Sequence, residues 1–513
     1  IKRATEVMHQ RERIRNLAIA AHIDHGKTTL SDNLIAGAGM MSEDLAGKSR
    51  VLDFDDQESA RGITINAASA SMVHSVGGDD YLINLIDTPG HVDFGGDVTR
   101  AMRAVDGCII LTCAVEGAMP QTETVVRQAL KEKVKPVLFI NKVDRLINEL
   151  QVTPEDMMNR FQEQITRVNT LIRQFAPEEH RKDWQVSVQG GTVAFGSAYH
   201  NWGITLPYMQ KSGINFPQIF EHCHNEEQKE LAKKAPVHEV LLDMAVEVLP
   251  SPLVAQKYRI PNIWQGDLES ETGKAMIGCD SDGPLSLMIT KIWMDPHAGE
   301  VAVGRIYSGT ISHGETVWAL GGAKAERVQQ VSMMVGGDRI QVPEVSSGNI
   351  VALTGVRSAA AGVTITREED ATPFEAIRHY SEPVVTVAVE PKSMKDLPKF
   401  IDALRSLAKA DASLQVFTNQ ETGEALLAGM GELHLEITVY RLEEEQNIKV
   451  SVSEPIVVYR ESISQDNKGR AFEGKSPNRH NRFYIETEPL PDDVVNALRE
   501  GTFGDGPVRN KDA

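Results

Sequence analysis

Cysteine is scarce in this sequence, and long apolar runs are absent. Four cysteines among 513 residues are too few for a disulfide framework and indicate a reducing compartment. The longest apolar run, residues 108–115, is far too short to cross a bilayer. The charged first sixteen residues lack the apolar core of a signal peptide. We therefore expect a cytoplasmic protein that does not enter a membrane.

A surplus of positive charge is also lacking. The chain has 53 lysines and arginines against 72 acidic residues, a formal net charge of −19, which weighs against nonspecific nucleic-acid binding through a broad basic surface. Two basic segments, residues 2–15 and 470–482, leave local RNA contact open, although a solvated charged face is the simpler interpretation of each. The cluster of His222, Cys223 and His224 has no second ligand pair nearby, so we expect solvated surface there rather than a metal site.

The hydrophobic pattern of the first half predicts an α/β domain. From residue 14 to about 252, short and nearly continuous apolar strands alternate with helical segments, which predicts a doubly wound, mostly parallel sheet. The alternating segment 64–76 and the turn after it predict a hairpin at the sheet edge. The polar stretch 149–189 is interpreted as an insertion before the last strand.

The second half has other patterns. From about residue 284, β-branched runs punctuated by glycines predict a small β-barrel. Segment 382–453 has the order strand, helix, strand, strand, helix, strand, which predicts a ferredoxin-like α+β domain. A further α+β domain is expected to begin after Pro455 and to be truncated. The predicted domains span residues 1–260, 261–375, 380–455 and 456–513.

Residues 21–28, AHIDHGKT, have the form of a phosphate-binding loop in which alanine replaces the first glycine. Gly26 permits close approach of the backbone to phosphates, Lys27 would reach the β- and γ-phosphates, and the Thr28 hydroxyl would ligate Mg²⁺. Ala21 lies at the loop entrance, where a methyl group is tolerable. Taken alone, the motif also fits an ordinary strand–turn–helix junction.

Later strands end in motifs that complete a guanine-nucleotide site. Asp87 can hold Mg²⁺ through water, and the Gly90 N–H can sense a γ-phosphate. The Asp144 carboxylate can accept the N1–H and N2–H₂ donors of guanine, whereas adenine would be repelled. Asn141 can contact the O6/N7 edge, and the stem of Lys142 can lie along the base plane. The segment Gly196–Ala198 can offer a backbone N–H to O6. Together these motifs predict GTP and GDP as ligands.

Two residues are candidates for the hydrolytic step. Thr64 can close over Mg²⁺ and the γ-phosphate and order residues 47–61 as a switch, the alternative being a plain strand start. His91 follows the γ-phosphate sensor and can orient or polarise the attacking water; the alternative is a structural loop histidine. We expect no catalytic role for His22 or His25, which lie inside the phosphate loop.

The predicted site residues fall into three groups. The catalytic residues are His91, Lys27 and Thr64, and the Mg²⁺ ligands are Thr28, Thr64 and, through water, Asp87. The residues predicted to contact the nucleotide are Ala21, His22, Ile23, Asp24, His25, Gly26, Lys27, Thr28, Thr29, Asp87, Thr88, Pro89, Gly90, His91, Asn141, Lys142, Val143, Asp144, Ser197 and Ala198.

These motifs resemble those of the translational GTPases, most closely the archaeal and eukaryotic elongation factor 2 group and more distantly bacterial elongation factor G. The segments that carry the resemblance include AHIDHGKTTL, ARGITI, LIDTPGHVDF, FINKVDRLI and GMGELHLEI, within residues 15–484. Alanine at position 21 belongs to the family's own form of the loop. The resemblance implies ribosome-stimulated GTP hydrolysis coupled to translocation of tRNA and mRNA.

The resemblance also implies partners: the ribosome, through large-subunit rRNA and stalk proteins, and the tRNA–mRNA complex, with a monomer off the ribosome. Two alternatives stay open. One is a related GTPase of ribosome maturation or the spliceosome; the compact N-terminus argues against the spliceosomal relative. The other is a GTP-regulated scaffold with negligible turnover, against which the presence of His91, Thr64 and Lys27 argues.

Overall fold

The computed structural model describes residues 2–39, 56–61, 64–225, 227–295, 298–335, 338–377, 383–411, 413–418, 425–454, 456–457, 471–477, 480–491 and 493–494. The chain divides into two compact units, residues 1–456 and 457–513. Residues 47–55 of the predicted switch lie outside the described ranges. No helix in the described ranges is both long enough and apolar enough to span a membrane.

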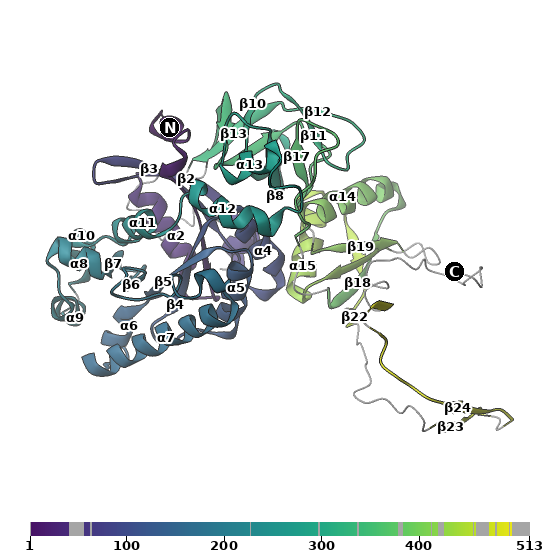
Figure 1. Cartoon of the computed structure of the whole chain (residues 1–513). Coiled ribbons are helices and arrows are strands. Elements are labelled where there is room, and N and C mark those ends of the chain that lie inside the picture. The colour runs from purple at the N-terminus through teal and green to yellow at the C-terminus, as the bar shows by residue number, and fades with distance from the viewer. Residues whose placement is uncertain are drawn as a thin grey trace. The chain divides into compact units, whose positions relative to one another are not determined.

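The first region of the larger unit is built on a mostly parallel sheet (Figure 1). Its strand order is β2-β3-β1-β4-β5-β6-β7, in which β3, β1, β4, β5 and β6 run parallel and the outer strands β2 and β7 run antiparallel to their neighbours. The strands are β1 (Ile14–Ala21), β2 (Ala68–Val76), β3 (Asp79–Asp87), β4 (Gly107–Cys113), β5 (Lys135–Asn141), β6 (Val193–Ser197) and β7 (Trp202–Thr205). The predicted α/β fold is confirmed, whereas β7 was not foreseen.

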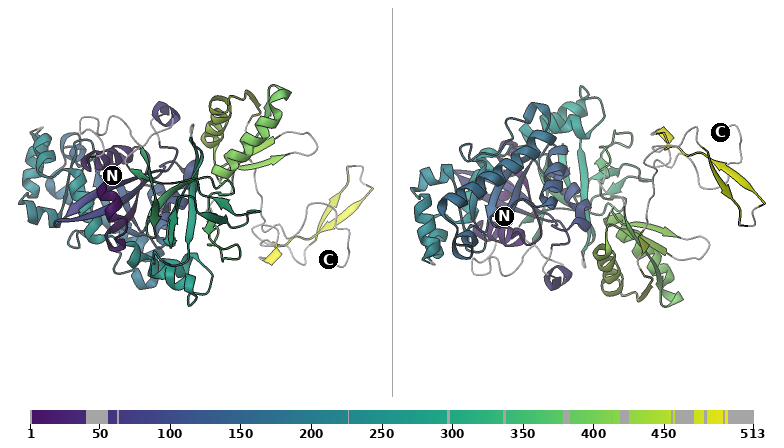
Figure 2. Two further views of the ribbon diagram at one scale, coloured as in Figure 1. Left: turned by 90° about the horizontal axis from the view of Figure 1, so that it is seen from above. Right: turned by 90° about the horizontal axis from the view of Figure 1, so that it is seen from below.

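Helices cover both faces of this sheet (Figure 2). Because side chains alternate along a strand, Leu17 and Ile19 of β1 pack with α2 and α11, while Ala18 and Ala20 pack with α4, α5 and α7. The helices of this region are α1 (Lys2–Val7), α2 (Lys27–Gly37), α3 (Asp56–Arg61), α4 (Gly95–Ala104), α5 (Pro120–Lys131), α6 (Val143–Asn148), α7 (Pro154–Phe175), α8 (Leu206–Ser212), α9 (Phe216–His224), α10 (Gln228–Lys234), α11 (Val237–Val248), α12 (Pro252–Ile263) and α13 (Glu271–Ile277).

The polar stretch 149–189, interpreted as an insertion, contains the long helix α7. Met157, Phe161, Val168 and Ile172 on one stripe of this helix are buried in the same core as α4 and α5. The rest of its surface is polar, which is why the composition of the stretch did not reveal a core helix.

The hairpin β2–β3 is antiparallel, as predicted, but its outer strand does not form a free edge. Ser71 of β2 forms a bridge to Val335 of β13, in the following region. The basic N-terminal segment packs against the same hairpin: Arg3 pairs with Asp80 and Arg13 with Asp79 at 2.8 Å. Both ion pairs are exposed, so two of these cations are paired within the chain on a face that stays in contact with solvent.

The second region is a barrel-like set of antiparallel strands around its own apolar core. Its strands are β8 (Ser286–Asp295), β9 (Gly299–Ser308), β10 (Thr310–Ser312), β11 (Thr316–Ala319), β12 (Glu326–Arg327), β13 (Gln330–Val335), β14 (Asp338–Val342), β15 (Glu344–Ser346), β16 (Ile350–Thr354) and β17 (Thr364–Thr366). The predicted β-barrel is confirmed.

The third region has the predicted βαββαβ order and an antiparallel sheet β19-β20-β18-β21. Its elements are β18 (Val385–Pro391), α14 (Leu397–Ala410), β19 (Gln415–Thr418), β20 (Ala425–Gly429), α15 (Glu432–Tyr440) and β21 (Val450–Val452), followed by β22 (Ile456–Val457). In the smaller unit, β23 (Phe472–Lys475) and β24 (Arg482–Ile485) pair as an antiparallel hairpin. The further α+β domain expected there lies largely outside the described residues.

Candidate nucleotide-binding site

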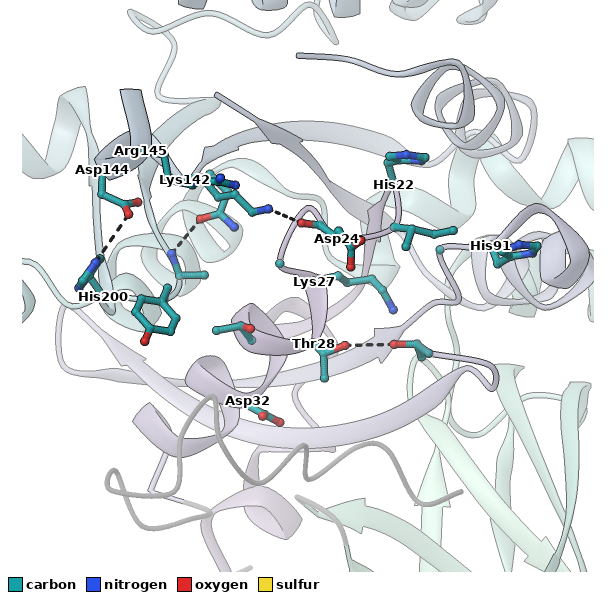
Figure 3. A pocket seen from close by; sticks show the side chains of 18 of the residues that line it. His22, Asp24, Lys27, Thr28, Asp32, His91, Lys142, Asp144, Arg145 and His200 are labelled. Atoms are coloured by element: carbon teal, nitrogen blue, oxygen red, sulfur yellow. Dashed lines mark hydrogen bonds and ion pairs between the residues drawn. The ribbon is translucent and has the colours of Figure 1, made fainter. Parts of the chain in front are cut away.

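A cavity of about 540 Å³ lies beyond the carboxyl ends of β1, β5 and β6 (Figure 3). This is the edge at which an open α/β sheet binds its ligands. The residues that line the cavity are His22, Ile23, Asp24, Gly26, Lys27, Thr28, Thr29, Asp32, Thr64, Gly90, His91, Asn141, Lys142, Asp144, Arg145, Glu149, Ala198, Tyr199 and His200.

Asn141, the last residue of β5, holds the loop after β1 in place through its side-chain amide. The Asn141 side-chain N–H₂ donates to the His25 carbonyl at 2.7 Å, and its oxygen accepts from the Ala198 N–H at 2.8 Å. Gly26, with φ +92°, lies against this amide, and a β-carbon there would be 2.6 Å from the Asn141 nitrogen. Asn141 thus fastens two loops together and keeps one N–H for the predicted base contact.

The structure explains why alanine is tolerated at the loop entrance. Ala21 is buried and belongs to the apolar core formed with Leu30 and Leu34 of α2. It does not line the cavity. A methyl group at this position therefore packs into the core and takes no space from a phosphate.

Lys27 and Asp87 form a buried ion pair, with Nζ 3.0 Å from Oδ1. Burial raises the pKa of Asp87, and the neighbouring ammonium group opposes that rise. Of the two partners, Lys27 lines the cavity and Asp87 does not. A lysine ammonium group thus lies at the end of the cavity where the sequence predicts the phosphates.

The two predicted threonine ligands are brought together. Thr28 Oγ1 and Thr64 Oγ1 lie 3.1 Å apart (Figure 3). Within the described ranges, no group of three or more His, Cys, Asp or Glu residues could hold a metal ion by itself. Hydroxyl oxygens next to a phosphate site nevertheless fit Mg²⁺, which takes few protein ligands and completes its shell with phosphate and water.

His91 lies at the margin of the cavity, in the loop after β3, and its side chain is 27% exposed. Its Nδ1 accepts a hydrogen bond from the Asp93 N–H at 3.2 Å. The ring also lies near that of Phe94, with 6.0 Å between centroids. One ring nitrogen is therefore committed to the loop itself.

The end of the cavity where the sequence predicts the base is formed by the loops after β5 and β6. The buried Oδ1 of Asp144 has no hydrogen-bond partner among the described residues, and Oδ2 lies 3.6 Å from His200 Nε2. The Lys142 ammonium group donates to the Asp24 carbonyl, so the lysine side chain crosses from the loop after β5 to the loop after β1 (Figure 3). Tyr199 adds an exposed ring to the lining.

Most predicted contact residues line the cavity, and seven do not. His25 is fully buried, where burial and the nearby His22 lower its pKa, and its Nε2 lies 3.2 Å from Glu116. The Thr88 hydroxyl donates to the Ile19 carbonyl and so braces the loop. The predicted residues outside the lining are Ala21, His25, Asp87, Thr88, Pro89, Val143 and Ser197.

Five lining residues were not predicted: Asp32, Arg145, Glu149, Tyr199 and His200. Asp32 lies one helical turn after Thr28, and Arg145 pairs with Glu149 at the same spacing, so helical periodicity next to each motif could have indicated them. Tyr199 and His200 directly follow the predicted Ala198, and no chemical pattern in the sequence marks them.

The family models match the three regions in chain order. Residues 12–251 match the elongation factor Tu GTP binding domain, residues 284–368 match elongation factor G domain 2, and residues 380–454 match elongation factor G domain III.

Three similar proteins carry the same name. Elongation factor 2 of Picrophilus torridus is 62% identical over 506 residues, which are 99% of this chain and 69% of that protein. Elongation factor 2 of Pyrococcus furiosus is 59% identical over 513 residues, covering 100% of this chain and 70% of that protein. The corresponding protein of Thermoplasma acidophilum is 59% identical over 506 residues, 99% of this chain and 69% of its own. With 59–62% identity over nearly the whole chain and a family model matched in each of the three regions, this chain belongs to the elongation factor 2 family of translational GTPases.

Proposed function

We propose that GTP binds in this cavity and is hydrolysed there. Separate residues of the lining contact the phosphates, the base and the attacking water. As a member of the elongation factor 2 family, the protein is a GTP hydrolase that promotes ribosomal translocation of tRNA and mRNA. The observation that supports the residue assignment is the cavity itself, whose lining brings Lys27, Thr64 and Asp144 together from loops far apart in the chain.

At the phosphate end, we assign Lys27 to the β- and γ-phosphates and the loop amides from Ile23 to Thr28 to the phosphate oxygens. Thr28 and Thr64 would hold Mg²⁺, with Asp87 behind them acting through water. When bound, the ion neutralises charge on the phosphates during transfer. Mg²⁺ itself is part of the proposal.

At the base end, Asp144 accepts the N–H donors of guanine and Lys142 covers the base plane. Support comes from the buried Asp144 oxygen without a partner in the described chain and from the lysine that spans two loops. Asn141 has a dual role, because it positions both loops and keeps one N–H for the base.

For hydrolysis, His91 orients the attacking water, whose oxygen bonds to the γ-phosphorus while the bond from that phosphorus to the β–γ bridging oxygen breaks. One proton of the water stays on the released phosphate and the other passes to solvent. The products are GDP and phosphate. The committed Nδ1 of His91 supports this role, because an oriented ring is what a water-positioning residue needs. Lys27 stabilises the charge that develops on the β-phosphate of the leaving GDP.

Further features of the whole protein are also proposals. We infer contacts with large-subunit rRNA, stalk proteins and the tRNA–mRNA complex, a cytoplasmic location and a monomer off the ribosome. The domain bounds 1–260, 261–375, 380–455 and 456–513 are proposed as well. A role in ribosome maturation or splicing, or as an inactive scaffold, is less compatible with 59–62% identity to elongation factor 2.

The test is GTP turnover of the chain with and without ribosomes, for the wild type and His91→Ala. We expect the variant to keep its GTP affinity and to lose stimulated turnover by about 100-fold or more, because only water orientation is removed. His9→Ala, which removes an exposed histidine, is the control. Unchanged turnover of His91→Ala on ribosomes would refute the catalytic role.

A further inference from the structure

The loop that carries His91 is fastened to the ferredoxin-like region through Asp93. One oxygen of the Asp93 carboxylate accepts a hydrogen bond from the His434 backbone N–H at 3.4 Å. His434 lies in the first turn of α15, whose N-cap is Gly431. A buried carboxylate of the GTP-binding region therefore lies at the positive end of a helix from another region.

Gly431 leaves the space that the Asp93 side chain occupies. A β-carbon at residue 431 would overlap both carboxylate oxygens of Asp93. The φ of Gly431 is −166°, an extended conformation that any residue adopts, so its backbone does not demand glycine. Glycine is required there because the Asp93 carboxylate occupies the space of a β-carbon.

The first turn of α15 is itself held from two directions. His434 Nδ1 accepts from the Met430 N–H at 3.1 Å, and Nε2 lies 2.9 Å from Asp411. Asp411 lies 3.7 Å from Arg100 of α4, which follows the His91 loop. The Phe94 ring meets the His434 ring edge to face, with centroids 6.0 Å apart. These contacts hold the first turn of α15, against which the Asp93 carboxylate packs, in a defined position.

On its other side, Asp93 contacts His91 at one ring nitrogen. The Asp93 backbone N–H donates to His91 Nδ1 at 3.2 Å, and the carboxylate Oδ1 lies 3.4 Å from the same atom. The amide suits an unprotonated Nδ1, and the carboxylate suits a protonated one. In either state Nδ1 is engaged by Asp93, so Nε2 is the ring nitrogen that remains for the attacking water in the role proposed for His91.

We propose that Asp93 is a positioning residue that sets the orientation of His91, and that Gly431 and the first turn of α15 clamp it for this task. The proposal rests on the catalytic role proposed for His91. Through this clamp the ferredoxin-like region affects the rate of GTP hydrolysis without touching the nucleotide.

The experiment measures ribosome-stimulated GTP turnover of the full chain and separates kcat from KM, with GTP affinity measured alongside. Asp93→Ala lowers kcat by about 10- to 100-fold and leaves KM and GTP affinity unchanged, because only the orientation of His91 is lost. Gly431→Ala has a similar effect, since the new methyl displaces Asp93. Gly95→Ala is the matched control, because a β-carbon there meets no atom within 4 Å.

Two double variants separate positioning from general damage. In the Asp93→Ala background, Gly431→Ala adds no further loss, because the group it displaces is gone. In the His91→Ala background, Asp93→Ala adds none, because it acts only through that ring. If Gly431→Ala does not fold, as judged by its melting temperature, the test is the comparison of Asp93→Ala, His91→Ala and their double variant.

The outcomes distinguish this inference from the proposed function. Asp93→Ala with wild-type kcat, beside an inactive His91→Ala, would overturn the positioning role alone. Equal losses from Asp93→Ala in the wild-type and His91→Ala backgrounds would also overturn it, since that result marks a structural role. Wild-type turnover of His91→Ala would instead remove the catalytic assignment on which the inference depends.

Discussion

At the scale of single residues, Asp144 is the strongest candidate for determining specificity for guanine over adenine. Its buried oxygen lacks a donor within the described part of the chain, and His200 is 3.6 Å from the other. A buried carboxylate oxygen without a hydrogen bond is unfavourable. A ligand edge that presents two N–H donors, as guanine does, relieves that cost. Adenine presents an acceptor at the same place and adds to it.

Asp144→Asn should therefore shift the preference from guanosine to xanthosine nucleotides. Xanthine carries a carbonyl where guanine has its amino group, and the asparagine N–H₂ can donate to it. We expect GDP affinity to fall by about 100-fold, the effect of losing hydrogen bonds to a charged group, while xanthosine diphosphate binds more tightly. Equilibrium binding of both nucleotides checks this, with Asp402→Asn at an exposed position as control. A retained preference for GDP would contradict the assignment.

At the scale of elements, the site is a set of strand ends tied together by side chains. Asn141 links the loop after β1 to the loop after β6. Lys142, the residue after Asn141, donates a hydrogen bond from its side chain to the Asp24 carbonyl in the loop after β1. Neither contact involves a ligand, so the cavity is held open by the protein itself. Preorganisation of this kind lowers the entropic cost of binding a nucleotide.

Gly26→Ala should collapse this arrangement. The φ of +92° is strained for alanine, and the new β-carbon would be 2.6 Å from the Asn141 amide, which has to move. Gly39→Ala is the matched control, since Gly39 has φ +74° but no atom within 4 Å of a β-carbon. Both variants incur a backbone penalty of about 1–2 kcal/mol. Only Gly26→Ala should also lose GTP affinity, by about 10-fold or more; equal affinities would contradict the role of the clash.

Local sequence patterns predicted most helices and strands, but they did not predict contacts between residues far apart in the chain. The strand, loop and helix from Ile14 to Gly37 could be predicted because apolar runs, glycine and the helix start lie within one short segment. The four-residue strand β7 could not, because its pattern is too short to separate from a loop. The contact of Asp93 with Gly431 joins residues hundreds of positions apart, and glycine there has no local turn signal.

At the scale of the whole larger unit, one buried carboxylate joins three parts of the chain. Asp106, which is fully buried, accepts from Asn16 at 2.9 Å and lies 3.0 Å from both Arg259 of α12 and Arg305 of β9. Arg259 also donates to the carbonyl of Met102, near the end of α4. The barrel is therefore anchored to the GTP-binding region by buried charge as well as by apolar packing.

Asp106→Asn tests how far the unit depends on this anchor. The substitution keeps the shape of the side chain but leaves two buried guanidinium groups without a counter-charge, which should destabilise the fold by about 3–5 kcal/mol. The midpoint of urea unfolding of the full chain measures the effect. Glu123→Gln breaks the exposed pair with Arg167, at 3.0 Å, and should cost no more than about 1 kcal/mol. A midpoint for Asp106→Asn equal to that of the control would show that apolar packing alone holds the barrel in place.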